Sequence, residues 1–287
     1  MREWLAARWG RTVSLVVVSL ILTFAFAAPL VILLVGLQNP DTLPSWVASL
    51  LGAENGAVSS SSLSFLLLAL VGLWIATSGL TAIFRAKILG LEIAALAQRM
   101  TDEIGAAPSG NTVRRSKQRL NIERQLIDAH YSLAVTSVRA AVFLAVSLLT
   151  SHAPLAVAVL AAQAYLLRSG LLRFREGRRI FERFDSINSR SGGKDGDPML
   201  VTEFGDWLGD SERKFNALPA RDYVVTAAIV TTAVAWQLTF GGPIDTWSSS
   251  IPLFGVWAFM ALDSSRALAH YGFSLARWSA EQTGEFV

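Results

Sequence analysis

A few ionisable residues interrupt long apolar runs, and they are the first candidates for chemistry in this chain. These residues are Arg139, Asp263, Arg266 and His270. A charge near the centre of a membrane costs about 3 kcal/mol on insertion scales, so such residues usually pair with one another or face water. We therefore take the four as candidates for a substrate path or a coupling path.

The depths of two of these charges are similar. Arg139 lies 11 residues before Thr150, at the outer end of its run, and Asp263 lies 13 residues after Ser250. At a helical rise of about 1.5 Å per residue, these spacings are depths of about 16 and 20 Å. We predict an ion pair between Arg139 and Asp263 at the wall of a translocation cavity. The alternatives are a pair that only fixes helix packing, or an arginine that extends towards the inner surface.

Two further residues follow Asp263 on the same helical face. Arg266 comes three residues later and offers Asp263 a second possible partner. His270 comes seven residues later, and a histidine side chain can accept and donate protons, which suits a proton relay. At the inner edge of an apolar run, His270 is also suited to simple hydrogen bonding.

Several other chemistries are excluded by composition. The chain contains no Cys and three scattered His, so disulfides, thiolate nucleophiles and a zinc cluster are not expected. There is no phosphate-binding loop of the form Gly-x-x-x-x-Gly-Lys-Ser/Thr. Gly192-Gly193-Lys194 is a near miss, but Asp195 stands where the Mg²⁺-binding hydroxyl is needed. We expect no enzyme activity and no cofactor bound by this chain alone.

The elements that position these residues are long apolar runs. Of 287 residues, 52% are hydrophobic and 16% are charged, against about 25% charged in soluble domains. Six runs approach the ~20 residues that a membrane span requires. They cover about residues 12–37, 62–84, 132–150, 154–172, 223–240 and 250–270. The prediction is an all-α polytopic membrane protein, with six transmembrane helices in one domain over residues 1–287.

Basic residues between the runs are strongly one-sided. Residues 1–11 hold three, residues 85–131 hold eight and residues 173–222 hold ten, whereas the alternate connections hold none. This bias places both termini and both long connections in the cytoplasm, on the inner side of the plasma membrane. One alternative is a cleaved signal peptide ending near Ala25-Phe26-Ala27.

The two long connections are predicted to be cytoplasmic helical hairpins, which we call the first hairpin (residues 85–131) and the second hairpin (residues 173–222). In both, apolar residues continue at helical spacing beyond the apolar run. A breaker cluster interrupts the first at residues 105–111 and the second at residues 189–198. Arms of about 20 residues would place the tip of the first hairpin about 30 Å outside the bilayer.

Short motifs accompany this layout. Ser109-Gly110-Asn111 precedes Arg119-Leu120-Asn121 in the first hairpin, and Ser279-Ala280-Glu281 follows the last run. In spacing and in these motifs, the chain resembles the transmembrane domain of six-span ABC exporters. It departs from the family pattern at Gln282, where the family usually has Arg, and it lacks the ATPase motif.

The resemblance implies a function that the composition alone does not. It implies a permease half that forms a homodimer or heterodimer and seats its hairpin tips on an ATPase carried by a separate chain, which would bind ATP and Mg²⁺. The residues expected at that ATPase are Gly110, Asn111, Phe204, Trp207 and Leu208. The substrate is open, since lipids, peptides and drugs all suit an apolar cavity with a few charges.

Two other functions fit the same sequence. One is a proton-coupled transporter on the same scaffold, in which Arg139, Asp263 and His270 would carry the coupling. The other is an accessory membrane protein whose basic hairpins bind a cytosolic partner. Nucleic-acid binding is not expected, because the basic residues are explained by membrane topology and contact with lipid phosphates.

Overall fold

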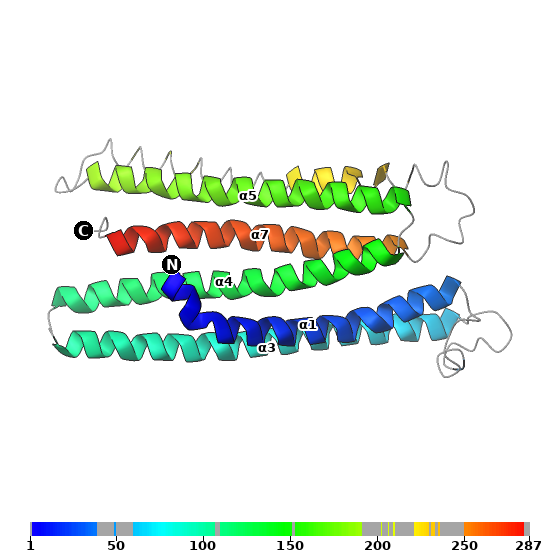
Figure 1. The fold of residues 1–287 in the computed structure, drawn as a ribbon, viewed down its shortest axis with the longest axis horizontal. Coiled ribbons are helices and arrows are strands. Elements are labelled where there is room, and N and C mark those ends of the chain that lie inside the picture. The colour runs from blue at the N-terminus through cyan, green and yellow to red at the C-terminus, as the bar shows by residue number, and fades with distance from the viewer. Residues whose placement is uncertain are drawn as a thin grey trace. The chain divides into compact units, whose positions relative to one another are not determined.

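The structure is a computed structural model of the chain, and its described residues are almost entirely helical. It describes residues 2–38, 49, 60–106, 110–150, 153–190, 202, 206, 209, 221–229, 231–232, 235 and 250–283. Figure 1 shows the five long helices in chain order. They are α1 (Arg2–Gln38), α3 (Ser60–Ala106), α4 (Gly110–Thr150), α5 (Ala153–Arg190) and α7 (Ser250–Thr283). Residues 221–229 form a further helical segment. The all-α prediction is confirmed.

Four of these helices are long and apolar enough to cross a membrane, as judged by length and composition over the described residues. The apolar segments are Trp4–Leu33, Leu68–Asp102, Arg119–Leu149 and Ala156–Glu176. They include most of the first four predicted spans. Over its described residues α7 is not among them, because Asp263, Arg266 and His270 fall within its apolar part. Of the predicted fifth span, residues 223–240, the structure describes residues 223–229, 231–232 and 235, and all of these are helical.

Helix boundaries agree with the breaker clusters. α3 ends at Ala106 and α4 begins at Gly110, so the break is narrower than the predicted cluster over residues 105–111. α4 ends at Thr150 and α5 begins at Ala153, with Pro154 in its first turn, where a missing N–H is harmless. α5 ends at Arg190, inside the second cluster.

The start of α1 differs from the prediction. Residues 2–11 were expected to be a basic segment outside the first span, but α1 already begins at Arg2. The Arg8 guanidinium lies 4.2 Å from the centre of the Trp4 ring and donates to the Trp4 carbonyl oxygen at 3.2 Å. This contact, one turn apart, lets a basic residue lie within the helix with its charge partly covered by an aromatic face.

The chain divides into two compact units. Unit 1 comprises residues 1–86, 134–162 and 228–261, and unit 2 comprises residues 87–133, 163–227 and 262–287. The first segment of unit 2 agrees within two residues at each end with the first hairpin, residues 85–131.

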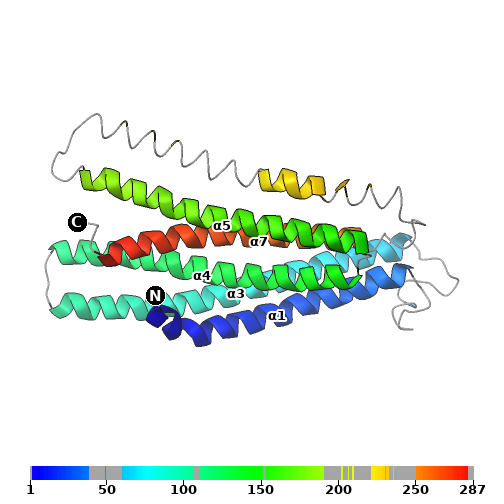
Figure 2. The same ribbon diagram turned by 45° about the horizontal axis from the view of Figure 1, so that its top comes forward.

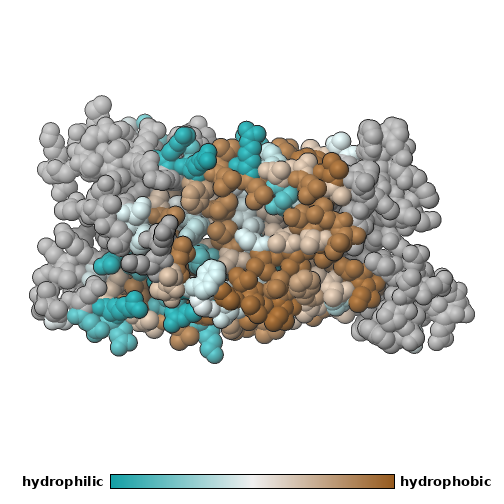
Figure 3. Space-filling model, viewed as in Figure 1, coloured by the Kyte–Doolittle hydropathy of each residue, from teal (hydrophilic) through white to brown (hydrophobic). Residues whose placement is uncertain are grey.

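Unit 1 has an aromatic core and an apolar outside. The Phe26 ring lies 4.8 Å from the Trp74 ring and 6.0 Å from the Phe143 ring, measured between centroids. On its surface, large hydrophobic side chains are exposed, including Ile21, Ile75 and Val157. Figure 3 shows hydrophobic side chains covering a continuous part of the molecular face. Such a surface is typical of helices solvated by lipid rather than by water.

Unit 2 contains the antiparallel arms of α3 and α4, which lie side by side in Figures 1 and 2. The buried Glu92 carboxylate on α3 accepts a hydrogen bond of 3.3 Å from the Tyr131 hydroxyl on α4. α4 also contacts α7, since Arg277 donates to Gln125 at 2.9 Å. These long-range polar contacts join neighbouring helices and fix their positions along the helix axes.

α5 and α7 approach each other closely in unit 2, because small residues line their contact. A Cβ added to Gly272 would lie 2.9 Å from the Cα of Phe174 and 2.6 Å from its ring. A Cβ added to Gly170 would lie 3.1 Å from the Leu268 side chain. The glycine at position 272 is therefore required by packing.

Replacing Gly272 by alanine is expected to lower the free energy of unfolding by about 1–3 kcal/mol, the usual cost of forcing an extra methyl group into a packed contact. The measurement is unfolding of the purified protein in mild detergent. Gly90→Ala is the matched control, because a Cβ there meets nothing within 4 Å and alanine is the better helix former. Equal stability of both variants would contradict the packing assignment.

Candidate functional site

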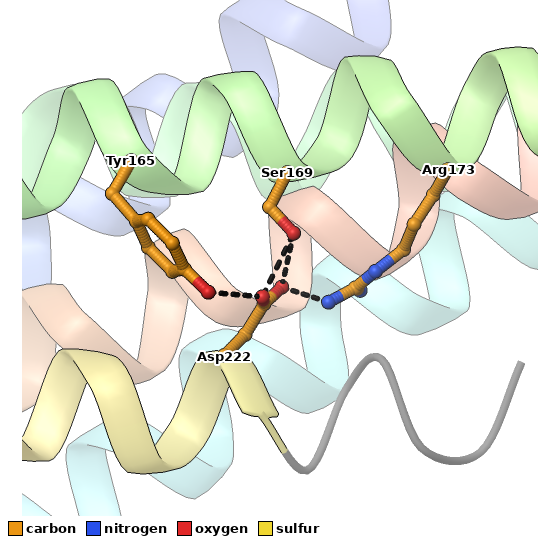
Figure 4. Close-up of polar contacts among 4 residues, drawn as sticks. All are labelled: Tyr165, Ser169, Arg173 and Asp222. Atoms are coloured by element: carbon orange, nitrogen blue, oxygen red, sulfur yellow. Dashed lines mark hydrogen bonds and ion pairs between the residues drawn. The ribbon is translucent and has the colours of Figure 1, made fainter. Parts of the chain in front are cut away.

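A buried carboxylate in unit 2 collects three side chains from one helix, and we call this cluster the polar clasp. It consists of Tyr165, Ser169 and Arg173 on α5 and Asp222 in the segment 221–229. Figure 4 shows the three α5 side chains pointing towards Asp222. Asp222 is 0% exposed and Arg173 is 3% exposed, so the ion pair is closed to solvent within this chain, whereas Tyr165 is half-buried.

Each of the three α5 side chains reaches a carboxylate oxygen of Asp222. Tyr165 donates to Oδ1 of Asp222 at 3.1 Å, and the Ser169 hydroxyl lies 2.8 Å from Oδ1 and 2.9 Å from Oδ2. The Arg173 guanidinium forms an ion pair with Oδ2. A carboxylate has about four lone-pair sites, so these donors satisfy most of its capacity. The ion pair thereby gains the additional hydrogen bonds that a buried charge requires.

The local sequence explains this geometry. Tyr165, Ser169 and Arg173 are spaced four residues apart, so they lie one above another on a single face of α5. Asp222 lies in the helical segment 221–229 and faces these three side chains (Figure 4).

The clasp joins the two ends of the second hairpin. Arg173 and Asp222 are the first and last residues of the range predicted for it, residues 173–222. Because the pair is buried and hydrogen-bonded, it fixes the distance between α5, which leads into the hairpin, and the segment 221–229, which follows it. A buried ion pair of this kind holds structure, and its carboxylate is engaged by all three α5 side chains.

α7 lies beside the clasp. The Arg266 guanidinium lies 4.8 Å from the centre of the Tyr223 ring, next to Asp222 in the chain. On the α5 side, Gly170 follows Ser169, and a Cβ added to Gly170 would lie within 4 Å of Leu268 and Ser265 of α7. The candidate coupling residue Arg266 therefore has an aromatic partner in the described structure.

The other three predicted path residues are placed as follows. Arg139 is half-buried in unit 1, with its guanidinium 5.7 Å from the centre of the Trp74 ring. Asp263 and His270 are exposed on α7 in unit 2, and His270 Nδ1 lies 3.5 Å from the Ser274 hydroxyl. The predicted Arg139–Asp263 pair joins residues of two different units, and it stays a prediction.

Exchanging the two charges tests that prediction. Asp263→Arg and Arg139→Asp are each expected to reduce the folded yield or activity several-fold, because each leaves like charges in an apolar setting. If the residues pair, the double exchange restores most of the wild-type value. A double variant as impaired as the sum of the single variants would contradict the pair.

The predicted docking residues are described only in part. Gly110 and Asn111 were expected in a turn, but they form the first turn of α4. Phe204, Trp207 and Leu208 lie outside the described residues. Within the described part of the chain, no group of three or more His, Cys, Asp or Glu is arranged to hold a metal ion.

No protein-family model and no curated protein matches the sequence. The described residues define an all-helical protein, four of whose helices are long and apolar enough to cross a membrane.

Proposed function

We propose that the chain is the permease subunit of an ABC-exporter-like transporter, with six spans and both termini in the cytoplasm, working with an ATPase on a separate chain. The observation that carries this proposal is the length of the helices. α3 has 47 residues, α4 has 41 and α5 has 38. At about 1.5 Å per residue, α3 is about 70 Å long, more than twice a hydrocarbon core of about 30 Å.

Helices of this length suit mechanical coupling. One continuous helix that passes from an apolar segment into a segment with charged residues transmits motion at its far end to the membrane, because a helix is stiff along its axis. In α3 the apolar residues 68–84 lead without a break into the first hairpin. An ATPase that moved the hairpin tips would thereby move the spans.

The polar clasp supports the same mechanism. By tying Arg173 to Asp222, it makes the base of the second hairpin a rigid connection rather than a hinge. A push at the tip of that hairpin would then reach α5 and the segment 221–229 together. The chain's own residues supply positioning in this proposal, and the partner supplies nucleotide hydrolysis with ATP and Mg²⁺.

Site-directed cross-linking tests the docking arrangement. The chain has no Cys, so a single introduced cysteine carries a photoreactive maleimide at one known position. Asn111→Cys and Asp206→Cys, near the two predicted tips, are expected to cross-link to a nucleotide-binding protein in native membranes. Ser151→Cys, in the predicted outer turn, is the control. Failure of both tip positions to capture a nucleotide-binding protein would contradict the proposal.

A proton-coupled transporter is the second candidate, and the exposed residues of α7 favour it. Asp263 and His270 are both exposed at positions seven residues apart on one face of α7, where they could exchange protons with a water-filled cavity. Under this alternative, Asp263→Asn abolishes uptake driven by a pH gradient, and changes at the hairpin tips have no effect.

A further inference from the structure

The arginines of α5 divide between two faces of the helix, and only one face is used by the polar clasp. Arg173 points to Asp222 and is buried, whereas Arg168, Arg175 and Arg179 are exposed. One helix therefore uses chemically identical side chains for two purposes. The buried arginine holds the fold, and the exposed arginines are available to a ligand outside the chain.

The exposed arginines belong to a stripe of exposed side chains on α5, from Val157 to Arg179, whose polarity changes along the helix. Its first part is purely apolar, with Val157, Leu160 and Leu167 exposed. Its last part contains both arginines and leucines. The exposed residues there are Arg168, Leu171, Leu172, Arg175 and Arg179. The arginines are seven and four residues apart, and Leu171 and Leu172 lie between the first two, so all five residues lie on one broad face for about three turns.

This order follows the profile of one bilayer leaflet. The apolar residues belong to the segment Ala156–Glu176, which is apolar enough to cross a membrane, and leucines suit the depth of the acyl chains. Arginine at the end of a span extends its guanidinium to the lipid phosphates. Its planar fork binds a phosphate through two parallel hydrogen bonds.

We propose that this stripe binds an anionic phospholipid of the cytoplasmic leaflet. Arg168 and Arg175 hold the headgroup phosphate, and an acyl chain lies along Leu167 and Leu160. The two arginines are seven residues apart, which is two turns or about 10 Å along the axis. They therefore approach one phosphate from both sides along the helix, with Leu171 and Leu172 between them.

A lipid fits this surface better than an acidic protein does. The basic residues are interspersed with exposed leucines. The apolar part of the stripe, with Val157, Leu160 and Leu167, extends from these leucines towards the membrane. An acidic protein would bind the charges and leave that apolar surface uncovered. Glu176, one residue beyond Arg175, is half-buried and pairs with Arg179 at 3.8 Å, so the pair Arg168 and Arg175 supplies the positive charge. The inference depends on the membrane placement of α5, and it does not require an ATPase partner.

Native mass spectrometry of the full chain tests the proposal, with phosphatidylglycerol as the anionic probe and phosphatidylcholine as the zwitterionic one. The wild-type protein in mild detergent is expected to retain phosphatidylglycerol preferentially. Arg168→Gln/Arg175→Gln should reduce the retained fraction at least five-fold. The matched control is Arg99→Gln/Arg124→Gln, which removes two exposed arginines from the same unit and should leave retention unchanged.

Three results would overturn the lipid assignment. They are equal retention of both lipids by the wild type, an equal loss in the test and control variants, and loss of a bound acidic protein instead of lipid. Unfolding in lipid-free detergent checks that the test variant is folded. If it is not, the milder Arg168→Lys/Arg175→Lys keeps the charge but loses the forked geometry, and it should retain less phosphatidylglycerol than the wild type.

Discussion

Replacing Asp222 by alanine is expected to destabilise the protein by about 3–5 kcal/mol, because the substitution leaves Arg173 buried and charged without its carboxylate. Arg173 is almost fully buried, so water cannot replace the lost partner. Tyr165 and Ser169 lose their acceptor at the same time. The measurement is unfolding of the purified protein in mild detergent, by heat or by increasing SDS.

Two controls separate the ion pair from a general effect at that position. Arg221→Ala removes the neighbouring exposed charge and should change stability by no more than about 0.5 kcal/mol. The double variant Arg173→Met/Asp222→Leu removes both charges, and it should be much more stable than either single variant, since apolar residues can replace a buried pair. Asp222→Ala as stable as Arg221→Ala would contradict the clasp.

Replacing Trp207 by aspartate is expected to reduce coupled transport by about 30-fold or more, while folding is preserved. A buried aromatic at the centre of an interface typically contributes 2 kcal/mol or more, about 30-fold in binding. In the proposed contact with the ATPase, the aspartate would also bring a charge that loses its water on docking, which weakens the contact further. Transport into inverted membrane vesicles is the measurement, with unfolding in detergent as the check on folding.

The neighbouring Asp206 provides the matched control. Asp206 is exposed, and Asp206→Asn should leave transport unchanged. If Trp207→Asp transports like the wild type, the second hairpin does not seat on an ATPase, and the proton-coupled alternative becomes the better account.

Much of the helical layout was predictable, because the features that end helices are local. The cluster Pro108-Ser109-Gly110-Asn111 lies at the break between α3 and α4, and Pro154 lies in the first turn of α5. Apolar runs of sufficient length likewise predicted the four helices that are long and apolar enough to cross a membrane. The start of α1 was missed, because Arg2 and Arg8 suggested a loop, although the Trp4 ring covers Arg8 within the helix.

The polar clasp was not predicted, and its physical basis explains why. The spacing of Tyr165, Ser169 and Arg173 shows that they share a face, but periodicity does not show what that face meets. Arg173 also occurs among many basic residues, which the topology already explained. The available indication was a carboxylate, Asp222, directly before an apolar run. A charge in that position needs a partner, and the opposite end of the hairpin supplies one.

The most direct test of the permease proposal is purification of the tagged chain from its native cells in mild detergent, with mass spectrometry and an ATPase assay on the eluate. The account predicts a stoichiometric ATPase protein and ATP hydrolysis, both lost with Trp207→Asp. A clean homodimer with no nucleotide-hydrolysing partner would contradict it.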